Sequence, residues 1–187
     1  AATGPKIIAI GAELGERVSF SLGADFERIK WGVGQVQALL NKNKDNQKLP
    51  PSLGVYLNIC IHNDVDRAAE LVRPGVGIFA HFTGMPGANR DNINPVDQTV
   101  FDTLGKQYDK KRHGRGEASH AQKMPIEFIE RFSLIGSAEK CIDRLLAIKK
   151  LGIERIFVIG PRPDHFGQEA DEAQARFAKE VIPALKD

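Results

Sequence analysis

The sequence predicts an α/β fold of parallel strands, each followed by a helix, and three observations support this prediction. Strand-like stretches alternate with stretches whose apolar residues recur every three to four positions. One strand-like stretch, residues 53–61, is almost continuously apolar, which is typical of a parallel strand covered on both faces. Capping and breaking residues mark the boundaries. Right-handed crossovers then give either a doubly wound open sheet or part of a (β/α)8 barrel, of which 187 residues supply about half.

The chain opens with a predicted helix that lacks a strand before it. Pro5 stands at its first position and Gly15 ends it. Three isoleucines are expected to pack inward: Ile7, Ile8 and Ile10. Residues 17–22 then alternate as a strand, and Asp25 is a natural N-cap for the next helix. The apolar stripe of that helix comprises Ile29, Val33, Val36 and Leu40.

A second strand–helix pair follows the loop at Pro50-Pro51. Its strand is the apolar stretch 53–61, and Asp64 caps the helix that follows. Pro74 is expected to kink or split this helix, because proline lacks the backbone N–H and its ring crowds the preceding turn.

The third pair lies near the carboxyl end. Ser137 caps a helix that Gly152 ends, and its apolar face carries Cys141, Leu145 and Ile148. Residues 153–160 are predicted to be the last buried strand. A final helix runs from about Gln168 to near Pro183. Its inward residues are Ala173, Phe177 and Val181.

Residues 84–124 interrupt this alternation. They begin with turn-forming residues, include a probable helix around residues 101–108, and end in a polar, basic stretch. An irregular segment of this length, inside a chain whose other connections are short, is more typical of a functional lid than of a linker. We therefore expect a single domain, residues 1–187, with an insertion or lid at 84–124.

Composition limits the classes of partner. The chain has 26 basic and 24 acidic residues, a net charge of +2, and both signs are interleaved. This distribution disfavours nucleic acid and anionic membranes, and favours small molecules. No apolar stretch reaches membrane-spanning length, and the start has no signal-peptide pattern. The two cysteines, Cys60 and Cys141, lack the spacing of a zinc site or a disulfide framework, so we expect a reducing, cytoplasmic location.

Ligands in both candidate architectures bind at the carboxyl ends of the parallel strands. Four corners are therefore expected on one rim: Thr3-Gly4-Pro5, Ser21-Leu22-Gly23, His62-Asn63-Asp64 and Gly160-Pro161-Arg162. A glycine just before a helix lets a phosphate approach backbone N–H groups at the positive end of the helix dipole. Structural interpretations without a ligand remain open at these corners. Gly4-Pro5 can simply begin a helix, Ser21 can cap a helix, and His62 can form a hydrogen bond with a neighbouring residue.

The basic part of the excursion is expected to hang over the same rim. Four of its residues are candidates for contact with an acidic substrate group or a cofactor tail: Arg112, His113, His120 and Lys123. A solvated loop is the alternative. Metal binding is not expected, because His113 and His120 lie in a stretch whose positive charge repels a cation. No HExxH, GxSxG, P-loop or complete GxGxxG motif occurs. His62 is a candidate general acid or ligand, but no residue is assigned as the catalytic acid.

Three segments carry a resemblance to a known family. They are "AATGPKIIAIGAELGERVSFSLGAD", "YDKKRHGRGEASHAQKMPIEFIERFSLIGSAEKCIDRLLAIKKLGIERIFVIGP" and "FAKEVIPAL". Together they resemble the carboxyl-terminal half of luciferase-like monooxygenases, in particular the branch similar to methylenetetrahydromethanopterin reductase. Members of this branch use FMN or the deazaflavin coenzyme F-420.

The resemblance implies a (β/α)8 barrel, usually in homodimers, with the flavin at the carboxyl ends of the strands. It implies that Thr3, Gly4 and Pro5 hold the cofactor phosphate and that Ser21 and Gly23 assist. It also implies that the excursion is a lid over the substrate. Some deazaflavin enzymes carry a lysine just beyond the second corner; here that position is Ala24, which argues against a sugar-phosphate substrate.

Two functions follow from this resemblance. The first is a flavin- or deazaflavin-dependent oxidoreductase acting on a small organic substrate, of which this chain is the carboxyl-terminal half. The second is a catalytically inactive half-barrel that self-associates and binds a flavin or serves a structural role. The chain begins without methionine, so we expect a processed or excised piece. Its partner is then a second copy or a complementary amino-terminal half-barrel. A small flavodoxin-like domain is disfavoured, because only three clear strands occur.

Overall fold

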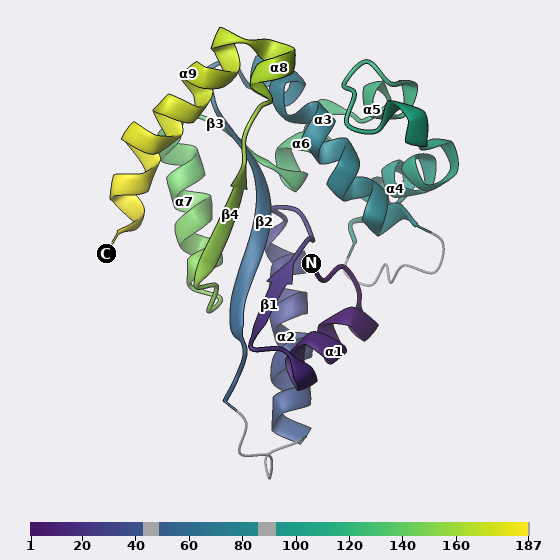
Figure 1. Ribbon diagram of the computed structural model, residues 1–187, viewed down its shortest axis with the longest axis vertical. Helices are drawn as coiled ribbons and strands as arrows, with labels where there is room; N and C mark the ends of the chain where they lie inside the picture. Colours follow the sequence, from purple (N-terminus) through teal and green to yellow (C-terminus); the bar gives the residue numbers. More distant parts are fainter. Residues whose placement is uncertain (43–48, 86–92, 187) are drawn as a thin grey trace.

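The computed structural model describes residues 1–42, 49–85 and 93–186, and its centre is a parallel sheet surrounded by helices (Figure 1). The strands are β1 (Arg17–Phe20), β2 (Ser52–Ile61), β3 (Leu134–Gly136) and β4 (Arg155–Ile159). Every strand pair is parallel. The α/β class predicted from the sequence is therefore confirmed.

The long strand β2 is the axis of the sheet. Gly54 and Val55 pair with β1 and also with β4, so these two strands flank β2 on opposite edges. The short strand β3 pairs with the last residues of β2, from Ile59 to Ile61. The sequence pattern did not predict β3, because three apolar residues after a helix show no periodicity of their own.

Helices of the regular strand–helix alternation pack against the sheet. They are α1 (Pro5–Leu14), α2 (Phe26–Lys42), α7 (Ala138–Lys149) and α9 (Gln168–Arg176), the last continued by Phe177–Val181 and Ile182–Leu185. Predicted caps at three helix starts are present. The Asp25 carboxylate accepts from the Arg28 N–H. The Asp64 carboxylate accepts from the Arg67 N–H, and the Ser137 hydroxyl oxygen accepts from the Lys140 N–H.

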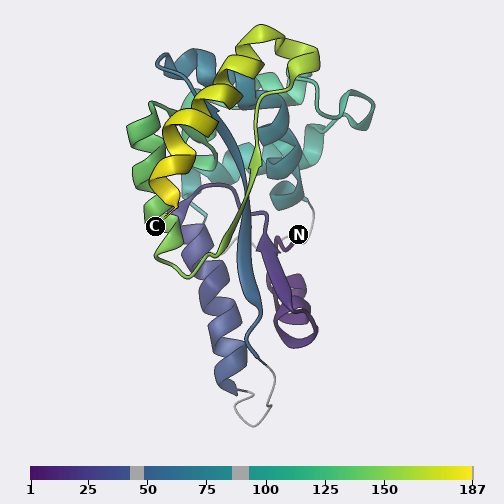
Figure 2. The ribbon, with the colours of Figure 1, turned by 60° about the vertical axis from the view of Figure 1, so that its left-hand side comes forward.

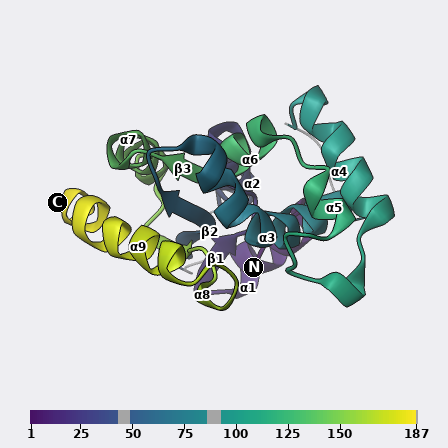
Figure 3. The same ribbon diagram turned by 90° about the horizontal axis from the view of Figure 1, so that it is seen from above.

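The excursion is helical. Its elements are α4 (Pro95–Gln107), η1 (Lys110–Arg112) and α5 (Ser119–Gln122), between α3 (Val65–Gly84) and α6 (Ile126–Phe132). A further short helix, α8 (Pro163–Phe166), follows β4. Seen from above, α3, α4 and α5 lie on the side of the sheet away from α7 and α9 (Figure 3). Residues 86–92 of the predicted insertion fall outside the described part of the chain.

Two hydrophobic cores lie on the two faces of β2. Leu57, Ile59 and Ile61 belong to the first core, with residues of β1, α1, α2 and α7. Cys60, which points to the opposite face, belongs to the second core, with residues of α3, α4 and α6. Each fully buried leucine or isoleucine contributes about 1.5–3 kcal/mol. Alternation along one strand therefore contributes side chains to both cores.

Three sequence expectations differ from the structure in detail. Pro74 does not split its helix, since α3 runs as one helix from Val65 to Gly84, and the proline ring is buried with its edge towards Gly116. Packing on both sides therefore outweighs the roughly 3 kcal/mol that proline costs inside a helix. Of the three isoleucines in α1, only Ile8 is buried, while Ile7 and Ile10 face outwards. Strand β4 is half-exposed, because no strand of the described chain covers its outer edge.

None of the helices within the described ranges combines the length and the apolar character needed to cross a membrane.

Candidate cofactor and substrate site

The first two predicted corners lie side by side at the carboxyl end of β1. Ala2 forms a parallel bridge with Phe20. The Ala2 N–H donates to the Ser19 carbonyl at 2.8 Å, and the Ser21 N–H donates to the Ala2 carbonyl at 2.9 Å. Ala2 thus occupies the position of a neighbouring strand, where the sequence pattern showed no strand before the first helix. The Thr3-Gly4-Pro5 corner and the Ser21 corner consequently belong to one rim.

Gly4 leaves open space at the start of α1. Its backbone is extended (φ −149°, ψ 167°), which any residue can adopt, and a Cβ placed there meets no atom within 4 Å. No side chain caps this helix. The first-turn N–H groups and the positive end of the helix dipole therefore face an unfilled space beside Gly4. A phosphate or carboxylate fits such a position.

Gly23 has a different role from Gly4. Its φ is +77°, and a Cβ at this position would lie 2.6 Å from Cδ2 of Phe132. The missing side chain therefore makes room for an aromatic ring of the second core, and the backbone needs the left-handed conformation that glycine permits. Ser21, next to it, is buried. Packing alone accounts for the glycine in this corner.

His62 is engaged locally. Its Nδ1 accepts a hydrogen bond from the Asp64 N–H at 3.0 Å, and Asp64 in turn caps α3. This matches the plainer reading of a strand-end histidine that bonds a neighbour, and it leaves His62 in a turn that sets the start of α3.

A cavity of about 460 Å³ opens where the excursion meets the rim. Its walls come from the start of α3, from the loop before α5 and from α8 after β4. The side chains involved include Arg67, Glu70, Arg115, Glu117, Asp164 and His165. The ends of β2 and β4 position these residues. The cavity therefore lies at the edge of the sheet where parallel α/β folds bind ligands.

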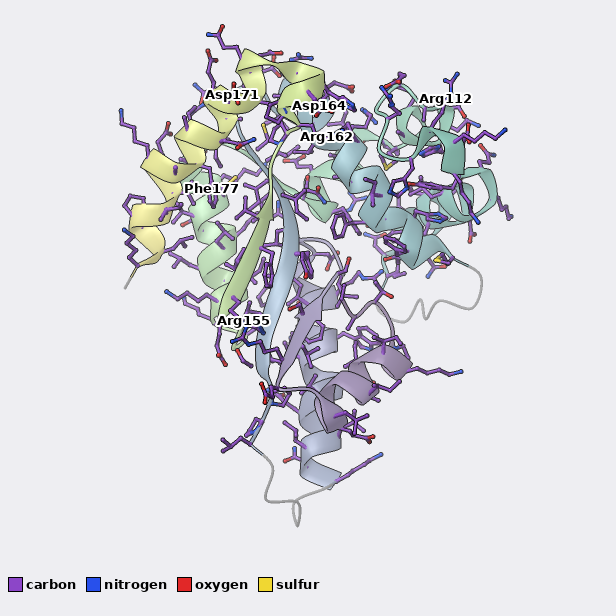
Figure 4. All side chains as sticks on the ribbon, viewed as in Figure 1. Arg112, Arg155, Arg162, Asp164, Asp171 and Phe177 are labelled. Atoms are coloured by element: carbon purple, nitrogen blue, oxygen red, sulfur yellow. The ribbon has the colours of Figure 1, made fainter. Side chains whose placement is uncertain are left out.

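Ion pairs hold several of the charged groups around this cavity. Arg67 Nε lies 2.9 Å from Glu169 Oε1, and the resulting pair holds the pKa of Glu169 below its usual range. Arg162 Nε lies 3.0 Å from Asp164 Oδ1, and this hydrogen bond lowers the pKa of Asp164. Both carboxylates consequently stay ionised to lower pH than usual. Figure 4 shows Arg162 and Asp164 together at the top of the sheet.

The comparisons with known proteins are decisive for the family. Residues 1–155 match the family described as luciferase-like monooxygenase. The chain belongs to the luciferase-like monooxygenase family. A curated relative, 5,10-methylenetetrahydromethanopterin reductase of Archaeoglobus fulgidus, is 25% identical over 194 residues, which cover 99% of this chain and 53% of the reductase.

Two solved structures of the luciferase-like type show the same fold. One is the coenzyme F-420 dependent tetrahydromethanopterin reductase of Methanopyrus kandleri, with a TM-score of 0.67 and 19% identity, covering 99% of this chain and 50% of that one. The other is an F-420-dependent secondary alcohol dehydrogenase in complex with an F-420–acetone adduct, with a TM-score of 0.66 and 18% identity, covering 100% and 48%. The fold is therefore part of a (β/α)8 barrel, and the chain spans about half the length of these relatives.

The four basic residues predicted for the lid of this luciferase-like chain lie away from the cavity. Arg112 is exposed at the outer end of the excursion (Figure 4). His113 Nδ1 lies 2.5 Å from the Tyr108 hydroxyl, and His120 is buried with its ring 4.3 Å from the Tyr108 ring. Lys123 donates to the Gln107 side chain. The structure gathers three of them around α4 and Tyr108, and their contact with a substrate stays a prediction.

Arg115, which the sequence places over the rim with the other basic residues of the excursion, lines the cavity, whereas Glu117 is a cavity residue that the sequence reasoning missed. A signal was present, because Arg115 stands between two glycines. Gly114 has φ +71°, and a Cβ there would lie 3.4 Å from Nη1 of Arg162. Glycine in this loop therefore allows the excursion to approach the end of β4. Periodicity does not indicate such an approach.

Proposed function

We propose that this chain is the carboxyl-terminal half of a deazaflavin-dependent oxidoreductase of the luciferase-like class that acts on a small organic substrate, with coenzyme F-420 favoured over FMN. The names of the relatives support the cofactor, since all three act in F-420 or methanopterin chemistry by their printed descriptions. The observation that carries the proposal is the open space beside Gly4 at the uncapped start of α1.

The residues at this corner fit a phosphate group. Gly4 offers backbone approach without a side chain in the way, and Thr3 adds a hydroxyl on a half-buried residue. Pro5 fixes the first turn, so the following N–H groups point along the helix axis. The buried Ser21 holds the neighbouring backbone through its bond to Ala2. We therefore propose that this corner binds the phosphate group of the cofactor.

The bound deazaflavin would supply two-electron transfer to or from the substrate. The chain's own part is to orient the cofactor and to border the substrate. The cavity lined by Arg67, Arg115 and His165 is the candidate for polar groups of either molecule. No described residue is assigned as a catalytic acid or base. The two buried free thiols, Cys60 and Cys141, agree with a proposed cytoplasmic location.

The corner is tested by replacing Gly4 with valine and titrating F-420 and FMN separately by fluorescence. We expect at least a tenfold loss of affinity for the preferred cofactor, since the valine side chain fills the open space. Gly34→Val is the matched control, because Gly34 also has no atom within 4 Å of a Cβ but lies inside α2. Unchanged affinity in Gly4→Val would show that this corner does not hold the phosphate.

An inactive half-barrel that self-associates is the second candidate. The exposed edge of β4 favours it, because an unpaired strand with apolar side chains tends to associate. A wild-type chain that forms oligomers and binds neither cofactor would support this reading.

A further inference from the structure

Several charged side chains that line the cavity between α3, the excursion and α8 are already held in ion pairs. The pairs are Arg67–Glu169, Glu70–Arg73 and Asp164–Arg162. Each pair combines one positive and one negative group, so the three pairs together add no net charge to the cavity. Their charged groups are occupied with each other, and a ligand has to find its partners elsewhere.

Two further charged side chains at this cavity have no such partner. Arg115 and Glu117 both line it, and within the described ranges of the chain neither side chain forms a hydrogen bond or an ion pair. They carry opposite charges and stand two positions apart on one loop. A guanidinium group binds a carboxylate with two parallel hydrogen bonds, and a carboxylate accepts from an ammonium group. The loop therefore presents one binding group for each sign of charge.

Packing on both sides fixes the backbone of this loop. Gly116 lies against Pro74 of α3, because a Cβ on the glycine would be 3.2 Å from the proline Cγ. The Gln122 side chain donates to the Gly116 carbonyl at 2.7 Å. Ala118 is fully buried, and its N–H donates to the Arg115 carbonyl at 3.3 Å. The charged side chains thus extend from a fixed backbone, which reduces the conformational entropy lost on binding.

Helix α8 gives the cavity an aromatic wall. Phe166 lines the cavity, and the guanidinium carbon of Arg67 lies 5.9 Å from the centroid of its ring. His165 lines it as well, with its ring centroid 6.2 Å from that of Phe166. Figures 1 and 2 both show α8 at the end of the molecule towards which β2 and β4 run. Next to the two free charges, the cavity therefore has a surface for an apolar group.

The arrangement of charges restricts the kind of ligand. A molecule with only negative charge is attracted by Arg115 and repelled by Glu117, and a molecule with only positive charge meets the opposite conflict. A molecule that carries both signs of charge avoids both conflicts. The volume of about 460 Å³ suits a small ligand, since small-molecule sites usually measure about 300–1,000 Å³.

We propose that this cavity binds a small zwitterion with an apolar side group, of the chemical class of the α-amino acids. The ligand's carboxylate pairs with Arg115, its ammonium group pairs with Glu117, and its apolar group packs on Phe166. The inference deepens the proposed function by naming a substrate class for the cavity, and it rests on that function only in calling this ligand the substrate.

The test compares three probes that share a phenyl group. L-phenylalanine carries both charges, phenylpropionate carries only the carboxylate, and phenethylamine carries only the ammonium group. Each is titrated at neutral pH into the full chain without cofactor, and binding is followed by the amide chemical shifts in NMR spectra. We expect L-phenylalanine to bind at least fivefold more tightly than either analogue, because each analogue loses one charge-assisted contact and keeps one repulsion.

Two variants assign the affinity to the two charges. Arg115→Gln should weaken binding of L-phenylalanine and of phenylpropionate at least fivefold and leave phenethylamine no weaker. Glu117→Gln should weaken L-phenylalanine and phenethylamine and leave phenylpropionate no weaker. Lys111→Gln and Glu127→Gln are the matched controls, because these exposed residues carry the same charges on η1 and α6 without lining the cavity. Both controls should leave every affinity unchanged.

Several results would overturn the proposal. They are equal affinity for the three probes, the same losses in the control variants, shifts confined to other parts of the chain, or no binding of L-phenylalanine up to about 10 mM. A chain that binds L-phenylalanine in the expected pattern but no deazaflavin supports the amino-acid site and contradicts the proposed cofactor. A chain that binds deazaflavin but not L-phenylalanine contradicts this inference alone, so the two proposals fail separately.

Discussion

The two faces of β2 carry two regions that are built differently. On one face, α1, α2 and α7 follow the regular strand–helix alternation, and mainly aliphatic side chains, together with the ring of Phe20, fill the core. On the other face, α3, α4 and α6 pack around three aromatic rings, Phe101, Phe128 and Phe132. The second region lies within and beside the predicted lid, yet it has a buried core of its own. The described residues of the predicted lid therefore belong to a packed layer of helices.

Polar contacts join the helices of the second region to one another. Arg73, on α3, donates to the carbonyls of Ala121 at 3.1 Å and Met124 at 2.7 Å. Arg131, on α6, pairs with the buried Asp97 of α4. In the first region, Arg144 of α7 makes comparable contacts by donating to several backbone carbonyls, but the buried faces of α1, α2 and α7 also follow apolar periodicity. The comparison teaches that polar contacts occur in both regions, whereas the sequence marks in advance only the packing of the regular one.

Loss of an aromatic ring should have the largest effect. Phe101→Ala removes a fully buried ring that contacts Phe128 and Phe132 edge-on, and we expect the free energy of unfolding to fall by about 3–5 kcal/mol. Urea denaturation measures this, and hydrogen exchange shows where protection is lost. A fall of less than 1 kcal/mol would mean that the second core is not cooperative with the sheet.

Removal of the buried arginine should be next in size. Arg73→Met keeps the side chain's length but removes the arginine's hydrogen bonds to the carbonyls of Ala121 and Met124, so we expect a loss of about 2–4 kcal/mol in urea denaturation. Glu70→Gln is the control, since this carboxylate is partly exposed and its pair with Arg73 contributes at most about 1 kcal/mol. Equal losses in the two variants would assign the effect to the ion pair.

The two cysteines report on the two regions separately. Burial raises the pKa of Cys60, in the second core, to about 12, and that of Cys141, in the first, to about 11, from an ordinary 9.0. The unfolded chain therefore loses these protons first, and stability falls as pH rises above 9.0. We expect a decrease of up to about 1.4 kcal/mol per pH unit for each thiol, measured by urea denaturation of Cys60→Ala and Cys141→Ala.

The thiols also test whether the regions open together. Neither thiol should react with a disulfide reagent at pH 8 except through opening of the fold, because both are buried and protonated. Equal reaction rates in the two single variants would indicate a single cooperative unit. Faster reaction of Cys60 would show that the second region opens alone.

Acid should weaken the second region by the smallest amount. Burial lowers the pKa of His81 and of His120, whose rings pack on Tyr108. The unfolded chain binds these protons first, so stability present above about pH 6.5 declines as pH falls. We expect less than about 1.4 kcal/mol per pH unit for each histidine. Hydrogen exchange at pH 7.5 and 5.5 should show the loss in α4 and α5, and equal loss in α2 would contradict it.

The sequence alone determined the alternation of strands and helices, the caps at Asp64 and Ser137 and the apolar face of α7, because periodicity and capping act within a few residues. It also indicated that the first two corners share a rim, since parallel strands end on the same side. These features needed no knowledge of distant contacts.

Tertiary structure decided the rest. The sequence predicts that Ile8 and Ile10 both pack inward, but in the structure Ile8 is buried and Ile10 is exposed. The sequence pattern shows that a residue is apolar but not whether a neighbouring element covers it. Gly4 and Gly23 looked alike as corner glycines, yet one faces open space and the other the ring of Phe132. The cavity residues come from segments far apart in the chain, and only folding brings Arg67, Arg115 and His165 together.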